Sequence, residues 1–218
     1  MAASRTARGK VGRPTLERAG EVEERILDAA KTVFLAHGFE GASVDEIAQT
    51  ARAGKPTIYA RFPSKAALFA AVIGRHAARN TQYENLTPQG RTFRAKLISL
   101  GLTLIERAFV DETIGLMRTA IAESPRFPEL TLEIQDTARR RATENVAHVI
   151  GELARAEGLF GKGAFAADRL EDSARIFLDL VIFAVLMRIL LGEDMRMLKK
   201  EAQAHVEKRV DFFLAATT

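Results

Sequence analysis

The sequence contains no cysteine, and its four histidines are far apart, at positions 37, 76, 148 and 205. Without cysteine the chain has no disulfide, thiol nucleophile or thiolate metal ligand, which fits a reducing cytoplasm. The histidines lack the spacing of a metal site, and no glycine-rich phosphate loop follows a strand pattern. We therefore expect no enzymatic activity, no cofactor and no metal.

Long apolar runs are also scarce. The most hydrophobic stretch, residues 176–191, has 14 apolar residues out of 16 but contains Asp179 and Arg188. It is too short and too charged for a membrane span. The basic N-terminus has no apolar run behind it and so lacks the pattern of a secretory signal. These absences predict a cytoplasmic protein without a membrane partner.

Acidic residues are missing between Glu46 and Glu84, where the basic residues are Arg52, Lys55, Arg61, Lys65, Arg75 and Arg79. Solvent-exposed faces usually mix the two signs of charge. A long stretch of one sign predicts a surface that faces phosphate groups, and phosphate contacts supply most of the non-specific affinity of proteins for DNA. The partner expected from this pattern is double-stranded DNA.

Residues 43–65 predict two short helices joined by a tight turn. Ser43 and Glu46 fit a capping box, in which each side chain satisfies a backbone N–H at a helix start, so a helix should begin directly after Ser43. A glycine-containing turn at 53–54 precedes a second helix over residues 56–62, which a proline ends. This arrangement is typical of a helix-turn-helix.

On a helical wheel, Ile58 and Phe62 of the second helix turn inward. The side chains left outermost are Pro56, Thr57 and Ala60, with Tyr59 and Arg61 on the flanks and Lys55 at the leading end. A short helix with small outward residues fits a major groove, which is about 12 Å wide. The pattern predicts that this helix reads DNA bases. The alternative for each single cation is a solvated surface charge.

Several residue groups resemble the N-terminal domain of the TetR/AcrR family of bacterial transcriptional regulators. They are Gly38-Phe39, Ser43-Val44, Ile47-Ala48, Lys55, Thr57-Ile58-Tyr59, Phe62 and Ser64-Lys65-Ala66-Ala67-Leu68-Phe69. The resemblance implies a dimer that binds a palindromic operator, usually as a repressor, and is released when a small molecule fills the C-terminal domain. The chain departs from the family pattern at Arg52, where glycine is common, and at Gly54, where a hydroxyl residue is common.

The DNA-binding residues predicted from these patterns are Arg13, Ser43, Lys55, Pro56, Thr57, Tyr59, Arg61 and Lys65. Arg13 lies in a basic arm, residues 1–18, and Gly12-Arg13-Pro14 is similar to arms that read the minor groove. A flexible tail that aids solubility is the alternative for this segment. In the helix-turn-helix, Ser43 and Lys65 are expected to hold phosphates, while the residues of the second helix meet bases and phosphates.

The rest of the chain reads as helices throughout, so the fold class expected is all-α. We predict a flexible arm at 1–18, a DNA-binding domain at 19–83 that includes a connecting fourth helix, and a ligand-binding and dimerisation domain at 84–218. The helices expected in the last domain are Arg91–Phe109, Glu112–Glu123, Pro128–Glu157, Ala166–Leu191 and Asp194–Ala215. The break after Glu123, together with Arg118, resembles the effector domain of one TetR subgroup.

The stretch 176–191 is apolar on nearly every side, and the final helix adds further apolar residues. We expect these two C-terminal helices to pair with their copies in a homodimer, as a four-helix bundle. The predicted interface residues are Phe177, Val181, Val185, Ile189, Val206, Val210 and Phe213. A pocket for a small apolar or aromatic effector is predicted at Phe93, Phe109, Met117, Phe127 and Phe177. The alternatives are a monomer with a large core and, for each aromatic residue, a packing role.

These features together predict a ligand-responsive transcriptional regulator, with repression as the expected action. An α-helical small-molecule-binding protein that does not read DNA is the alternative. The two differ in the salt dependence of DNA affinity, because each phosphate contact contributes about −0.9 to the slope of log affinity against log salt.

Overall fold

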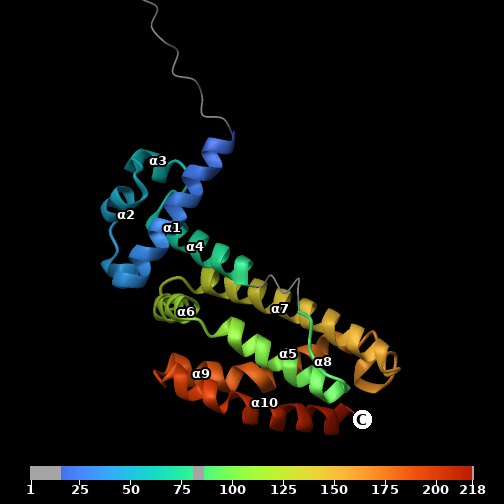
Figure 1. Ribbon diagram of the computed structural model, residues 1–218. Coiled ribbons are helices and arrows are strands. Elements are labelled where there is room, and N and C mark those ends of the chain that lie inside the picture. Colours follow the sequence, from blue (N-terminus) through green and yellow to red (C-terminus); the bar gives the residue numbers. More distant parts are fainter. Residues whose placement is uncertain (1–15, 81–85, 218) are drawn as a thin grey trace, which may run out of the picture. The chain divides into compact units, whose positions relative to one another are not determined.

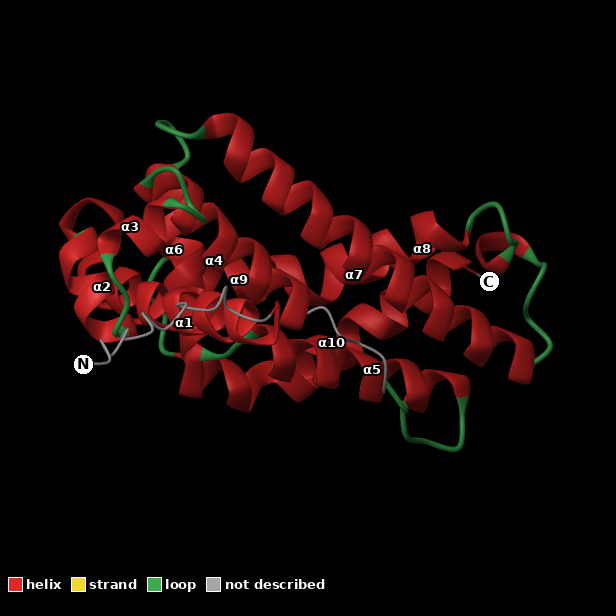
Figure 2. Cartoon of the chain, turned by 90° about the horizontal axis from the view of Figure 1, so that it is seen from above, coloured by secondary structure: helices red, strands yellow, loops and turns green. Residues whose placement is uncertain are grey.

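The computed structural model describes residues 16–80 and 86–217, which form helices and loops without a strand (Figures 1 and 2). The chain divides into two compact units, Met1–Phe69 and Ala70–Thr218. The division falls inside α4 (Lys65–Asn80), so this helix supplies residues to both units. The expected all-α class, with an N-terminal helix-turn-helix and a C-terminal helical domain, is confirmed.

Unit 1 contains α1 (Leu16–Gly41), α2 (Val44–Ala51), α3 (Lys55–Tyr59) and the start of α4. At Gly38 of α1, φ is +67°, which breaks the helix before a last turn resumes. α3 is shorter than the expected 56–62. Beyond it, the Phe62 N–H still donates to the Ile58 carbonyl at 2.8 Å, so one further turn forms before Pro63.

The core of unit 1 is built on the apolar face of α1, which packs against α2. Phe34 and Phe39 stack with ring centroids 6.0 Å apart. Phe69 from α4 meets the edge of both rings, at 5.0 and 5.3 Å. All three side chains are buried, so α4 completes a core that α1 begins.

Unit 2 consists of the remainder of α4 and the elements that follow it. These are α5 (Phe93–Ala108), α6 (Asp111–Glu123), α7 (Pro128–Ala156), a 3₁₀ turn (Gly163–Phe165), α8 (Leu170–Leu178), a π-helical segment (Asp179–Phe183), α9 (Ala184–Leu190) and α10 (Met195–Thr217). In the core of the unit, α5 packs on α10 and α7 packs on α8.

The long C-terminal helix expected over Ala166–Leu191 is divided in the structure. Its middle widens into the π-helical segment, where the ring of His205 on α10 lies with Nε2 3.0 Å from the carbonyl oxygen of Val181. A carbonyl only accepts, so Nε2 donates here. A wide turn shifts carbonyls out of the regular helical ladder, and the histidine satisfies one of them from a neighbouring helix.

The structure corrects the residues predicted for a subunit interface. All seven are buried inside the single chain and belong to the core of unit 2: Phe177, Val181, Val185, Ile189, Val206, Val210 and Phe213. Other apolar side chains remain exposed on α8, the π-helical segment, α9 and α10, and they are described below. A helix that is hydrophobic all round does not reveal from sequence which side faces its own core.

Among the described residues, no helix has the combination of length and hydropathy that a membrane crossing needs.

Candidate nucleic-acid interface

The helix-turn-helix begins at Ser43, whose backbone is extended and whose hydroxyl accepts the N–H of Glu46 at 3.1 Å. The predicted start at Val44 is confirmed. The Glu46 carboxylate turns to His37, with Oε1 3.1 Å from Nε2. The hydroxyl of Ser43 therefore caps α2, and a phosphate contact from the same side chain stays a prediction.

The turn between α2 and α3 is closed by backbone hydrogen bonds. The N–H of Ala53 donates to the carbonyl of Ala48 at 3.0 Å, and the N–H of Arg52 donates to that of Gln49 at 3.1 Å. These two bonds form a Schellman motif, which requires a left-handed residue at the helix end. Arg52 occupies that position with φ 50°.

α3 is anchored by Ile58 and, just beyond its end, by Phe62, which are 1% and 7% exposed. The predicted inward direction of both is confirmed. Pro56 and Ala60 are exposed as expected, whereas Thr57 is half-buried and Tyr59 is 47% exposed. A helical wheel predicts the direction of each side chain but takes no account of its length. Tyr59 lies on the flank, and its long side chain extends into solvent. Tyr59 is thus the large exposed side chain of this helix.

Two cations flank α3. At its first residue, Lys55 Nζ lies 2.5 Å from the Oδ1 of Asp45. Their hydrogen bond raises the pKa of Lys55 above its ordinary value. Beyond the helix, Arg61 Nη1 donates to the carbonyl of Thr57 at 3.4 Å.

Lys65, at the start of α4, is held by unit 1 itself. Its ammonium donates to the carbonyls of Ala42 at 3.1 Å and Glu40 at 3.3 Å, and lies 4.6 Å from the ring centroid of Phe39. These contacts fasten the start of α4 to the end of α1. Sequence spacing could not reveal this role, because the partners lie more than twenty residues away.

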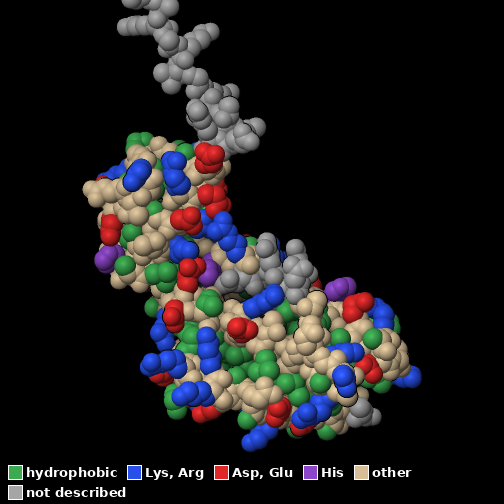
Figure 3. All heavy atoms as spheres, viewed as in Figure 1, with side chains coloured by type: hydrophobic (Ala, Val, Ile, Leu, Met, Phe, Trp, Pro, Cys, Tyr) green, Lys and Arg blue, Asp and Glu red, His purple; other side chains and the backbone are tan. Residues whose placement is uncertain are grey.

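Arg13, the predicted minor-groove residue, lies outside the described residues. In the upper part of Figure 3, where unit 1 lies, basic side chains share the surface with acidic ones. The stretch of one charge sign in the sequence is therefore partly offset in space, since Asp45 of α2 pairs with Lys55.

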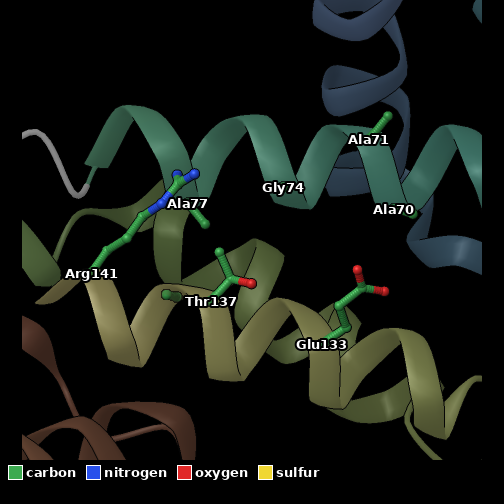
Figure 4. Close-up of a pocket in the computed structure, with 8 residues that line it drawn as sticks. Ala70, Ala71, Gly74, Ala77, Glu133, Thr137 and Arg141 are labelled. Carbon is green, nitrogen blue, oxygen red and sulfur yellow. The ribbon is translucent and has the colours of Figure 1, made fainter.

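Unit 2 contains an open pocket of about 340 Å³ between α4 and α7. Glu133, Thr137 and Arg141 point from α7 toward α4 (Figure 4). The α4 side is made of small residues, Ala70, Ala71, Gly74 and Ala77. Their spacing places them along one side of a helix, and this stripe of small residues is the signal in the sequence that points to the pocket.

The residues predicted for the effector pocket lie elsewhere. Phe93, Phe109 and Phe177 are buried in the core of unit 2, Phe127 is half-buried and Met117 is 39% exposed. None of the five lines the pocket between α4 and α7. Close to the α4 side of this pocket, His76 joins α4 to α6, with Nε2 2.9 Å from Thr113 Oγ1 and Nδ1 3.1 Å from Glu112 Oε1.

Comparison with known proteins agrees with this architecture. Residues 26–72 match the family described as bacterial regulatory proteins of the tetR family, and residues 95–216 match the C-terminal domain of AefR-like transcriptional repressors. The HTH-type transcriptional activator FasR from Mycolicibacterium smegmatis is 43% identical over 63 residues, which are 29% of this chain and 27% of that protein. The chain thus matches about a quarter of the length of this curated relative.

Two solved structures extend the similarity to most of the chain. A TetR-family transcriptional regulator from Mesorhizobium loti superposes with a TM-score of 0.79 at 24% identity, covering 91% of this chain and 97% of that one. The flavonoid-responsive regulator FrrA superposes with a TM-score of 0.64 at 27% identity, covering 90% and 97%. Because the C-terminal family match alone spans more than half of the sequence, this protein belongs to the TetR family of helix-turn-helix DNA-binding transcriptional regulators, which are not enzymes.

Proposed function

We propose that the protein is a ligand-responsive repressor that binds a palindromic operator as a homodimer and leaves it when a small apolar or aromatic molecule binds unit 2. The proposal that the protein reads DNA rests on which side chains of α3 are buried and which are exposed. Ile58 and Phe62 fix the helix on the core of unit 1, while Tyr59 and Pro56 stand in solvent beside the charged Lys55. A short anchored helix with exposed polar and cationic side chains fits a major groove.

The test of α3 uses Tyr59→Ala and Lys55→Ala, with Ile121→Ala, which changes a 54% exposed residue of α6, as the matched control. Affinity is measured by fluorescence anisotropy on a duplex selected by the wild-type protein from a randomised pool. We expect both α3 variants to lose roughly tenfold or more in affinity, since a good base or phosphate contact is worth about 1–3 kcal/mol. Folded variants that bind as tightly as Ile121→Ala would refute the assignment.

Support for a homodimer comes from apolar side chains that the single chain leaves exposed. Figure 3 shows hydrophobic side chains gathered on the visible face of unit 2. On α8 and the elements after it, the large exposed apolar residues are Ile176, Phe183, Met187, Leu191, Met197 and Phe212, from 38% to 82% exposed. α8 packs beside α10, so the two helices can present one surface to the same helices of a second subunit.

The dimer is tested by Phe183→Glu and Phe212→Glu, with Met117→Glu on α6 as control. Sedimentation velocity should give dimers for the wild type and the control and monomers for the two variants, because a buried carboxylate opposite its copy is strongly unfavourable. Dimers in all four samples would place the interface elsewhere.

A dimer also makes a prediction about the DNA. The two half-sites of the selected duplex should be separated by about 34–36 Å or a multiple of it.

The pocket between α4 and α7 supports the effector part of the proposal. Its volume of about 340 Å³ falls in the range of small-molecule sites, about 300–1,000 Å³. Small apolar residues on one wall suit a flat apolar ring, while Thr137 and Arg141 offer polar contacts at the other. Because α4 also begins in unit 1, a ligand that displaces it acts on the element that both units share.

The effector is sought by screening aromatic compounds, flavonoids first, for release of the labelled duplex. Gly74→Leu should fill the pocket, since nothing lies within 4 Å of a side-chain carbon added there. We expect this variant to bind the duplex normally and to ignore the compound that releases the wild type. Release of Gly74→Leu at the same concentration would move the effector site elsewhere. If the protein binds compounds but shows no salt-dependent DNA affinity, it is the alternative, a small-molecule-binding protein that does not read DNA.

A further inference from the structure

The turn of the helix-turn-helix contains an unusual backbone. Arg52, with φ 50°, is the non-glycine residue with a positive φ in the described ranges 16–80 and 86–217. A side-chain carbon makes this conformation unfavourable, and glycine or asparagine normally occupies it. The helix end therefore gains nothing in local stability from an arginine at this position.

The other cations of this region contact the protein itself. Lys55 is paired with a carboxylate, and Arg61 and Lys65 donate to backbone carbonyls. Arg52 is exposed and forms no side-chain hydrogen bond or ion pair with another residue in the described parts of the chain. Its guanidinium is thus available to an external anion, at the turn directly before α3.

We infer that Arg52 is a phosphate-binding residue, which contacts the DNA backbone from the turn while α3 enters the groove. The inference rests on the DNA-reading function proposed above. A guanidinium binds phosphate through a planar fork of N–H donors and keeps its charge at all relevant pH values. Backbone strain at an exposed position is retained where the side chain has a function, and the neighbouring Gly54 offers no side chain for this contact.

The inference predicts that stability and DNA affinity change in opposite directions on Arg52→Gly. Glycine relieves the backbone, so the urea midpoint should rise. A dimer that loses two phosphate contacts should show a salt slope smaller by about 1.8, which corresponds to a loss of roughly 10- to 100-fold in affinity at 0.1 M salt and little loss near 1 M. Affinity should fall alike on the selected duplex and on a duplex of random sequence, because phosphates carry no sequence.

Three further variants make the result specific. Arg52→Asn accepts the left-handed backbone without a charge and should behave as Arg52→Gly, whereas Arg52→Lys should retain most of the salt slope. Arg91→Ala removes an exposed arginine of unit 2 and should leave the urea midpoint and the salt slope of DNA affinity unchanged. If the wild type binds DNA and Arg52→Gly and Arg52→Asn have the same salt slope as the wild type, the inference is wrong and the proposed function stands. If the wild type binds neither duplex, both fail.

Discussion

Lys55 Nζ lies 2.5 Å from Asp45 Oδ1, so the first residue of α3 is paired with the first turn of α2. The pair joins the two helices of the helix-turn-helix across their turn. It also places a negative charge where the proposed function brings phosphates. Both side chains are about half or more exposed, at 48% and 67%, so the pair adds little to stability. Its main effect should be on DNA affinity.

Asp45→Asn should therefore tighten DNA binding. The substitution removes a charge that repels phosphates and frees Lys55 to contact them, so we expect a gain of several-fold and a steeper salt slope, by about 0.9 for each new contact. Anisotropy titrations across a salt series measure both. Asp168→Asn, which removes an exposed acid of unit 2, is the control. Weaker binding by Asp45→Asn would show that the pair positions α3 for DNA.

Gly101 on α5 is predicted to accept no larger residue. A side-chain carbon there would lie 2.7 Å from Val206 Cγ1 and 3.3 Å from Val181 Cγ1, and both valines are fully buried. We expect Gly101→Ala to lower the free energy of unfolding by about 1–2 kcal/mol, since an overpacked core strains stiff neighbours. Urea titration measures the loss, and Val206→Ala in the same chain should recover part of it. Gly20→Ala, on open α1 surface, should not destabilise the fold.

His205 is predicted to make stability depend on pH. Burial lowers the pKa of its imidazole below the ordinary value, with the nearby charges of Arg209 and Arg188 acting in the same direction. The unfolded chain then binds a proton more readily than the folded one, so this contribution is present above about pH 6.5 and is lost as pH falls. His205→Gln, which can still donate to the Val181 carbonyl, should flatten the decline in urea midpoint between neutral and mildly acidic pH. An unchanged decline would contradict this prediction.

Arg118 is predicted to stabilise the junction of α6 and α9. Its guanidinium donates to the carbonyls of Ile189 at 2.5 Å and Leu190 at 3.2 Å, which are at the C-terminal end of α9. A cation at that end satisfies unpaired carbonyls and favours the helix dipole. Arg118→Met should cost about 1–2 kcal/mol in unfolding free energy, and Arg118→Lys less. Thermal midpoints that agree with the wild type would show that solvent replaces the guanidinium at no cost.

Features that depend on neighbouring residues could be predicted from the sequence. The role of Ser43 as a helix cap is decided within one turn of chain, and the structure shows it. The inward placement of Ile58 and Phe62 follows from helical periodicity alone. These local signals were enough to locate the helix-turn-helix.

Features that depend on distant residues could not be predicted. The wide turn around Val181 involves a histidine 24 positions later in the chain, and Lys65 finds its carbonyl partners 23 and 25 positions earlier. Burial of Phe177 beside exposed Ile176 depends on which side of α8 meets α10. Hydrophobicity alone does not distinguish these two neighbours. The small-residue wall of the α4 pocket could not be predicted, because alanine and glycine carry no distinctive side-chain chemistry.

The meeting of Phe34, Phe39 and Phe69 has a consequence for synthesis of the chain. The helix-turn-helix ends near Phe62, but the aromatic core of unit 1 needs Phe69, and the tie to the end of α1 needs Lys65. A nascent chain cannot complete this core until the first turns of α4 have left the ribosome. An isolated DNA-binding fragment must therefore include those turns if it is to fold.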